Sequence, residues 1–160
     1  MAYTDYEFYT ETYGSDVISE DEFSKYAERA SDRIDTLTFD RLIDNYPDNE
    51  RADKKIQKAA CALAETLYYI ELARNAAMDS IGTITNADGT VTSKLVTSRD
   101  SGSEGITYSS GSSSSSSEAT VYEAAVTDLD AEQNLIRRTA AQYLSGVRDS
   151  KGTLVLYGGF

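Results

Sequence analysis

The chain of 160 residues contains no histidine, no tryptophan, one proline and one cysteine. Histidine is the commonest general base and metal ligand near neutral pH, so its absence disfavours most hydrolase and metalloenzyme chemistry. Cys61 alone excludes an internal disulfide and a cysteine-based zinc site, and its place on an apolar helical face predicts a buried thiol. No Walker loop, GxGxxG after a strand, GxSxG or HExxH motif is present. We therefore expect no cofactor, no metal ion and no enzyme activity.

Long hydrophobic runs are also missing. No segment approaches the roughly 20 apolar residues that a membrane helix needs. Residues 1–7 have neither the basic region nor the apolar region of a secretory signal. We expect a protein that does not contact membranes and that is assembled in the cytoplasm.

Positive charge is scarce, because 15 basic residues face 27 acidic residues and the formal net charge is −12. The imbalance is concentrated in residues 1–50, which hold 14 acidic and four basic residues. Proteins that grip nucleic acid neutralise phosphates with Lys and Arg, so this balance disfavours DNA binding. An acidic surface can instead repel a duplex and let it pass.

Capping signals predict two helices in the first third. Thr4 with Glu7 forms a capping box for a short helix that ends at Gly14. Ser19 with Glu22 forms a second capping box, which predicts a helix from about Glu20. Its apolar residues recur at helical spacing as far as Leu37, so the helix has one buried face.

The remaining pattern predicts a mainly α fold, a small helical bundle in one domain. A turn around Pro47 precedes a long central helix from about Glu50 to Met78, and helical spacing returns from residue 122 to Gly146, either as one helix from Glu118 or restarting at Thr127. The helical core is thus expected at about 4–80 and 119–146. Residues 81–118 read as an insertion, with a β-hairpin at 83–92 and a flexible Ser/Gly-rich loop at 97–118. Residues 147–160 read as an extended C-terminal arm.

Two acidic features are candidate sites of chemistry. Residues 86–89 resemble part of a calcium loop, but the pattern places Ile84 and Leu95 where an EF-hand needs carboxylates, so we interpret them as a turn. Glu65, within the apolar central helix, is the carboxylate most worth testing for catalysis. A structural role, at a groove edge or paired with an Arg, is the favoured interpretation.

A basic stripe, formed by Arg51, Lys54, Lys55 and Lys58, lies at the start of the central helix. Cations there oppose the helix macrodipole, so local stability does not explain them. One interpretation is a contact with Glu20 and Asp21 of an adjacent copy. The other is a solvated face without a partner.

Six segments carry a resemblance to a known family. They are residues 2–14 (AYTDYEFYTETYG), 19–41 with SEDEF and IDTLTFDR, 59–65 (AACALAE), 105–109 (GITYS), and an ending with AAQYLSG at 140–146 and LVLYGG at 154–159. Together they resemble the head-tail connector (adaptor) proteins of siphophages and prophages of Gram-positive bacteria. The hairpin at 83–92 and the serine run at 112–117 depart from that pattern and lengthen the central loop.

The resemblance implies a structural role in the virion neck. Members of the family form a ring, generally of twelve copies, under the portal protein, where they extend the DNA channel and offer a docking surface to a tail-side neck or tail-terminator protein. Double-stranded DNA then passes through without specific binding. For this chain we expect portal contacts from Leu154, Val155, Leu156, Tyr157 and Phe160. A tail-terminator or other neck protein, and an acidic α-helical regulatory module, are the alternatives.

Overall fold

The computed structural model describes residues 2–79, 81–85, 91–99, 106–108 and 119–156, and the side chains of 2–78 and 121–156. The helices are α1 (Tyr6–Phe8), a π-helical turn η1 (Tyr9–Tyr13), α2 (Glu20–Thr38), α3 (Arg41–Asp44), α4 (Glu50–Asp79), α5 (Ala119–Thr127) and α6 (Leu129–Leu144). This confirms the predicted mainly α fold.

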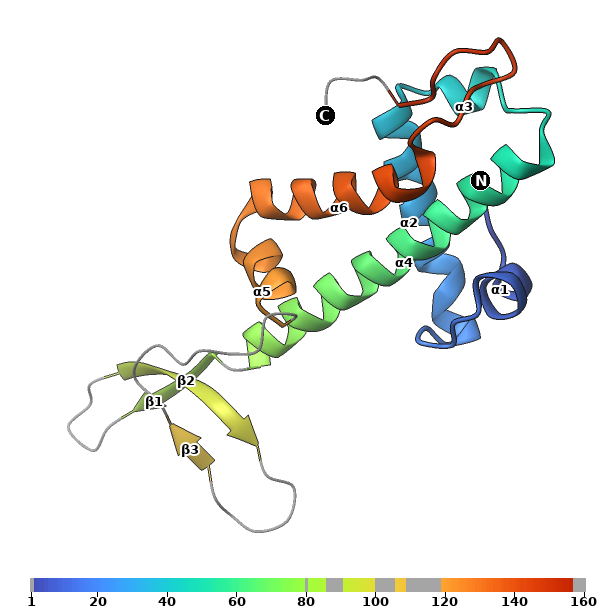
Figure 1. Ribbon diagram of the computed structural model, residues 1–160. Helices are drawn as coiled ribbons and strands as arrows, with labels where there is room; N and C mark the ends of the chain where they lie inside the picture. Colours follow the sequence, from blue (N-terminus) through green and yellow to red (C-terminus); the bar gives the residue numbers. More distant parts are fainter. Residues whose placement is uncertain (1, 80, 86–90, 100–105, 109–118, 157–160) are drawn as a thin grey trace.

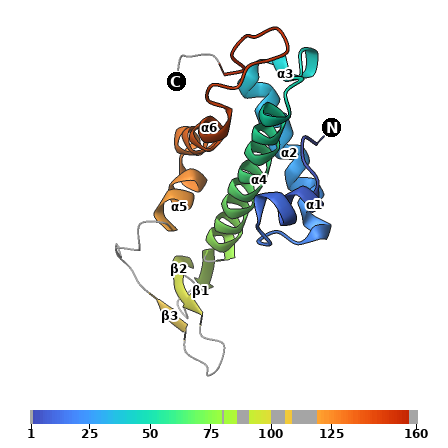
Figure 2. The same ribbon diagram turned by 45° about the vertical axis from the view of Figure 1, so that its right-hand side comes forward.

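The central helix α4 separates two layers. Figures 1 and 2 show α1 and α2 on one side of it and α5 and α6 on the other. One apolar stripe of α4, at helical spacing, is buried throughout: Ile56, Ala59, Ala60, Leu63, Leu67 and Ile70. Tyr68 and Tyr69 widen this stripe, because their rings meet Tyr26 of α2 and Tyr122 of α5. Helix α4 therefore contacts neighbours on both of its sides within one chain.

The first helix begins one residue later than its capping box predicts. Asp5 is the N-cap, and its carboxylate accepts a hydrogen bond of 2.8 Å from the Phe8 N–H. Thr4 is instead buried, with its hydroxyl 3.3 Å from the Cys61 thiol. Both residues can cap, and Thr4 packs inward because its neighbour Asp5 supplies the cap. Gly14 ends the segment in the left-handed conformation (φ 81°), as predicted.

Helix α2 begins at Glu20 as predicted and ends in an unusual reversal. Phe39 (φ 53°) and Asp40 (φ 59°) are both left-handed, and they are the only non-glycine residues with positive φ in the described part of the chain. The Asp40 N–H bonds the Asp35 carbonyl at 2.9 Å, which closes the last turn. The short helix α3 follows at once and leads through buried Pro47 to α4.

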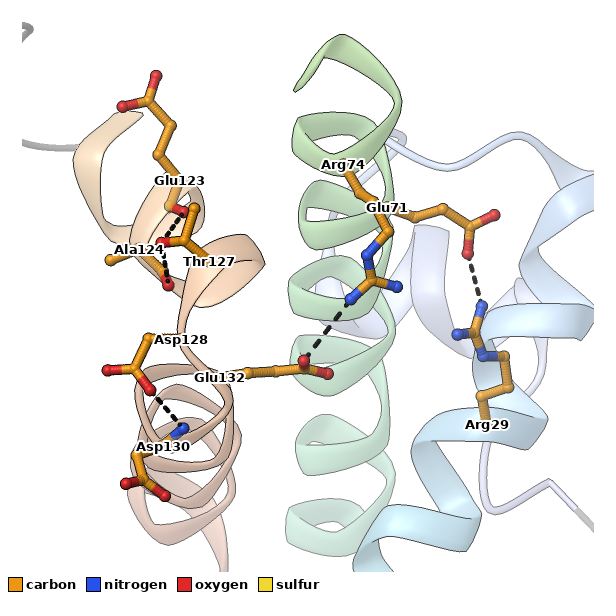
Figure 3. A network of polar contacts seen from close by, with 9 residues as sticks. All are labelled: Arg29, Glu71, Arg74, Glu123, Ala124, Thr127, Asp128, Asp130 and Glu132. Carbon is orange, nitrogen blue, oxygen red and sulfur yellow. Dashed lines mark hydrogen bonds and ion pairs between the residues drawn. The ribbon is translucent and has the colours of Figure 1, made fainter. Parts of the chain in front are cut away.

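The last helical segment is two helices, which decides between the two predicted alternatives. The break falls at Asp128, whose carboxylate caps α6 by accepting the Asp130 N–H (Figure 3). Thr127, the predicted cap, bonds back to the carbonyls of Glu123 and Ala124 and so belongs to the end of α5. Of the two alternatives the structure has the restart, with Asp128 in place of Thr127 as its capping residue.

Three strands lie beyond the end of α4 (Figure 1): β1 (Ile81–Thr85), β2 (Val91–Arg99) and β3 (Ile106–Tyr108). They pair antiparallel in the order β1-β2-β3. β2 and β3 include residues that the sequence assigned to a loop. The predicted hairpin turn at 86–90 and the rest of the predicted loop, 100–105 and 109–118, lie outside the described residues.

The predicted C-terminal arm is folded back onto the bundle as far as Leu156. Val155 is fully buried in the core, and its N–H bonds the Val147 carbonyl at 3.0 Å. The buried Asp149 carboxylate accepts the N–H groups of Lys151 and Thr153 and so shapes the turn. The expectation of a separate arm is therefore wrong for 147–156, because Val155 completes the core of its own chain.

Candidate interaction surfaces

Glu65 holds the N-terminal segment against α4. Its carboxylate accepts hydrogen bonds from the hydroxyls of Tyr9 (2.9 Å) and Tyr13 (3.3 Å), and from the Ser15 hydroxyl. Within the described part of the chain these three hydroxyls stand in place of the arginine that one of the two structural alternatives contained. Glu65 lines none of the surface hollows described below. This geometry agrees with the structural interpretation of Glu65.

Burial is the main cause of altered acidity around this cluster. It raises the pKa of Tyr9 to about 12, and the adjoining Glu65 carboxylate adds to the effect. Burial also raises the pKa of the Cys61 thiol to about 11, so the thiol is not activated. Among the residues that the structure describes, no group of acidic or cysteine side chains could hold a metal ion.

Ion pairs join α4 to both layers (Figure 3). Figure 3 shows Glu71 bonded to Arg29 of α2, at 2.6 Å. Glu71 also bonds Lys25 of the same helix at 2.8 Å. On the opposite side Arg74 lies 3.6 Å from Glu132 of α6. These charges therefore link helices within the chain.

The four residues of the basic stripe lie in different environments. Lys54 pairs with Glu50 at 2.7 Å, one turn earlier on α4. Lys58 is half-buried and Arg51 is exposed. Arg51 and Lys55 line a hollow of about 540 Å³ together with Arg148, which comes from the segment after α6. Sequence reasoning missed Arg148, since nothing in its local pattern indicates that it lies beside the start of α4.

Glu20 and Asp21, the expected partners of the stripe, are exposed in the first turn of α2. That end of α2 lies beside the second half of α4, because Lys25, one turn later, bonds Glu71. Lys55 precedes Glu71 by 16 residues, or about 24 Å of helix. The acidic and basic groups therefore occupy different ends of the α2–α4 pair.

Large apolar side chains are exposed at both ends of the bundle. At the α3 end these are Phe39 (69% exposed), Ile43 (65%) and Leu154 (39%). An apolar groove of about 580 Å³ opens beside them, lined by Tyr3, Leu42, Ile43 and Tyr46 among others. At the other end, called the α5 end, they are Leu72 (45%), Met78 (67%), Val121 (47%) and Leu129 (67%). The 30 residues of α4, about 45 Å of helix, run between the two ends.

The five residues expected to contact the portal are not equally available. Leu154 is exposed, Leu156 is half-buried, and Val155 is enclosed in the core. Tyr157 and Phe160 lie outside the described residues. Val155 is thus an anchor for the segment and not a contact residue in this conformation.

Comparison with known protein families, curated proteins and solved structures finds no match to this chain. None of the described helices has both the length and the apolar character required to cross a membrane.

Proposed function

We propose that the protein is a structural subunit of a phage neck, a head-tail connector that assembles into a ring under the portal protein. The ring extends the DNA channel and offers a surface to the tail-side proteins. The proposal starts from the sequence resemblance to the connector family. It places the protein in the virion, between head and tail.

The observation that carries the proposal is the exposed apolar surface at two separate ends of one small bundle. A closed ring of identical subunits needs a heterologous contact, in which one surface of a subunit meets a different surface of the next. A two-fold dimer needs only one self-complementary patch. The α3 end and the α5 end are two such different surfaces, carried on opposite ends of α4.

The charge of the chain favours a channel through which DNA slides. With a net charge of −12, the ring wall repels phosphates and does not retain the duplex. The ion pairs around Glu71 and Glu132 already occupy Lys25, Arg29 and Arg74, which leaves fewer cations for a phosphate backbone.

The portal contact is assigned to Leu154 and to the chain that follows Leu156, and the contact with the neighbouring subunit to Phe39 and Ile43 of the α3 end. Leu154 is exposed there, and its carbonyl is held by Arg41 at 2.8 Å. This contact presents the apolar side chain from a fixed backbone. A pre-ordered segment loses less conformational entropy on binding than a free arm.

The test is negative-stain electron microscopy of the protein mixed with the portal ring of the phage that encodes it. Because Val155 belongs to the core, the informative truncation ends at Leu156 and leaves the fold intact. Ring density added to the portal by the full chain, and lost with the truncation, supports the proposal. Equal unfolding midpoints of the two proteins serve as the control. Failure of the full chain to bind an intact portal, with binding to tail tubes instead, would favour a tail-terminator role.

A further inference from the structure

The hollow at the start of α4 is built from two distant parts of the chain. Pro47, Asp48 and Asn49 lead into α4 on one side, and residues 146–150 form the other. The Ser150 N–H bonds the Asn45 carbonyl at 3.3 Å, which holds the two sides together. The burial of Val147 and Asp149 fixes the second side to the core. The hollow is therefore a defined feature of the fold.

Positive charge predominates in this hollow. Arg51, Lys55 and Arg148 line it, and the N-terminal end of the 30-residue helix α4 adds a positive dipole end. Of its two acids, Asp149 is already occupied by the N–H groups of Lys151 and Thr153. Asp48 is the one exposed carboxylate on the lining. An acidic partner segment complements such a surface.

The same chain carries a suitable acidic segment that cannot reach its own hollow. Glu20, Asp21 and Glu22 form the exposed first turn of α2. This turn lies beside the part of α4 around Glu71, whereas the hollow lies at the opposite end of α4. Pairing between the two groups therefore requires a second copy, and it joins different surfaces of the two copies.

We propose that the hollow lined by Arg51, Lys55 and Arg148 is a socket for the first turn of α2 of a neighbouring copy. This inference rests on the proposed ring and names the polar contact that sets its subunit order. The apolar side chains of the α3 end and the α5 end provide the area that the contact between copies buries. The socket determines which surface of one copy meets which surface of the next. Charge complementarity contributes mainly to the specificity and speed of such contacts.

The test is a charge exchange in the full chain. The socket variant is R51E/K55E, and the α2 variant is E20K/D21K. Sedimentation equilibrium over a wide range of protein concentration measures the self-association of each. We expect the wild type to associate. Each variant alone should associate at least about tenfold more weakly than the wild type, because like charges then face each other. An equimolar mixture of the two variants restores association, since every contact again pairs opposite charges.

Two controls separate this result from a folding defect. R137E/R138E changes the net charge by the same amount as the socket variant, but on the exposed face of α6. We expect it to leave association unchanged. The socket variant places Glu at the start of α4, which the helix dipole favours, so circular dichroism and Tm remain those of a folded protein.

Association of the single variants at the wild-type level would overturn the socket, as would a mixture that fails to recover or a wild type that stays monomeric at every concentration. None of these outcomes depends on the portal. A wild type that decorates the portal while the charge exchange fails would keep the connector role and remove only the socket.

Discussion

The Tyr9 hydroxyl donates a hydrogen bond of 2.9 Å to the Glu65 carboxylate and so joins two residues 56 positions apart. Tyr9 is fully buried, and its ring stacks on Phe23 with 4.4 Å between centroids. Glu65 thus fastens the π-helical turn to α4, while Tyr9 also packs against α2. Through this pair the π-helical turn is joined to the core.

Replacing Tyr9 by Phe tests the contribution of this hydrogen bond. We expect Y9F to lower the free energy of unfolding by about 1–2 kcal/mol, because a buried bond to a carboxylate is lost while the ring packing stays. Urea unfolding followed by circular dichroism measures the change. Y6F is the matched control, since the ring of Tyr6 packs edge-on against the same Phe23. Equal effects of Y9F and Y6F would argue against a specific role of the Tyr9–Glu65 bond.

Alkaline pH should destabilise the fold through the buried tyrosines. Burial raises the pKa of Tyr9 from 10.0 to about 12, and it also raises the pKa values of Tyr3, Tyr13 and Tyr46. Below pH 10 these hydroxyls are protonated in both states and their contribution is fully present. Between about pH 10 and 12 the unfolded chain loses the protons that the folded chain retains, so stability falls.

Tyrosinate absorbance near 295 nm checks this expectation. The buried tyrosines should titrate together with unfolding, in the same pH range in which the helical signal disappears. A smooth titration of all 12 tyrosines near pH 10, with the helical signal intact, would contradict it.

Acid should remove the contribution of Glu71. The hydrogen bonds from Lys25 and Arg29 lower the pKa of Glu71 from 4.5 to about 2. The stabilisation is present above pH 4.5 and is lost as the pH falls toward 2. We expect E71Q to be less stable than the wild type by at most about 1 kcal/mol at pH 7, the range of exposed ion pairs.

The difference between E71Q and the wild type should shrink below pH 4.5 and vanish near pH 2, as measured by urea unfolding at each pH. E132Q is the comparison, because within the described residues the one ion pair of Glu132 is with Arg74, at 3.6 Å. It should show a smaller difference at every pH. A constant difference for E71Q across this range would show that packing, and not charge, causes it.

Val155 should anchor the segment after α6. We expect V155A to cost about 2 kcal/mol, because two buried methyl groups are removed and a cavity remains. The neighbouring L154A should cost far less, since Leu154 is 39% exposed. Unfolding curves give both values, and limited proteolysis should cut V155A faster around residues 150–153. Similar costs for the two variants would indicate that the segment is not held by Val155.

The sequence was sufficient for the elements whose signals are local. Helices starting at Glu20 and Glu50 follow from caps, a proline and a 3.6-residue period, and the structure has them there. The cap of α1 was misplaced by one residue, because Thr4 and Asp5 are adjacent and both can cap. Only the packing of Thr4 against Cys61 distinguishes them.

The candidate surfaces were harder to predict because they depend on contacts between distant segments. A short apolar run such as 153–156 has the same pattern whether it packs on its own core or on a partner. Arg148 joins Arg51 and Lys55 only because Val147 and Val155 bring that segment to α4. No periodicity within one segment contains this information.

The reversal at Phe39 and Asp40 lowers the stability of the isolated fold at a position that the proposed ring would use. Left-handed backbone costs a non-glycine residue roughly 1–2 kcal/mol, and glycine at either position would relieve that strain. Yet Phe39 is 69% exposed, so its side chain gives little back to the isolated fold. Glycine at position 39 would thus improve thermal stability while removing an aromatic ring from the α3 end. Under the proposed assembly, this corner would exchange stability of the monomer for a contact between subunits.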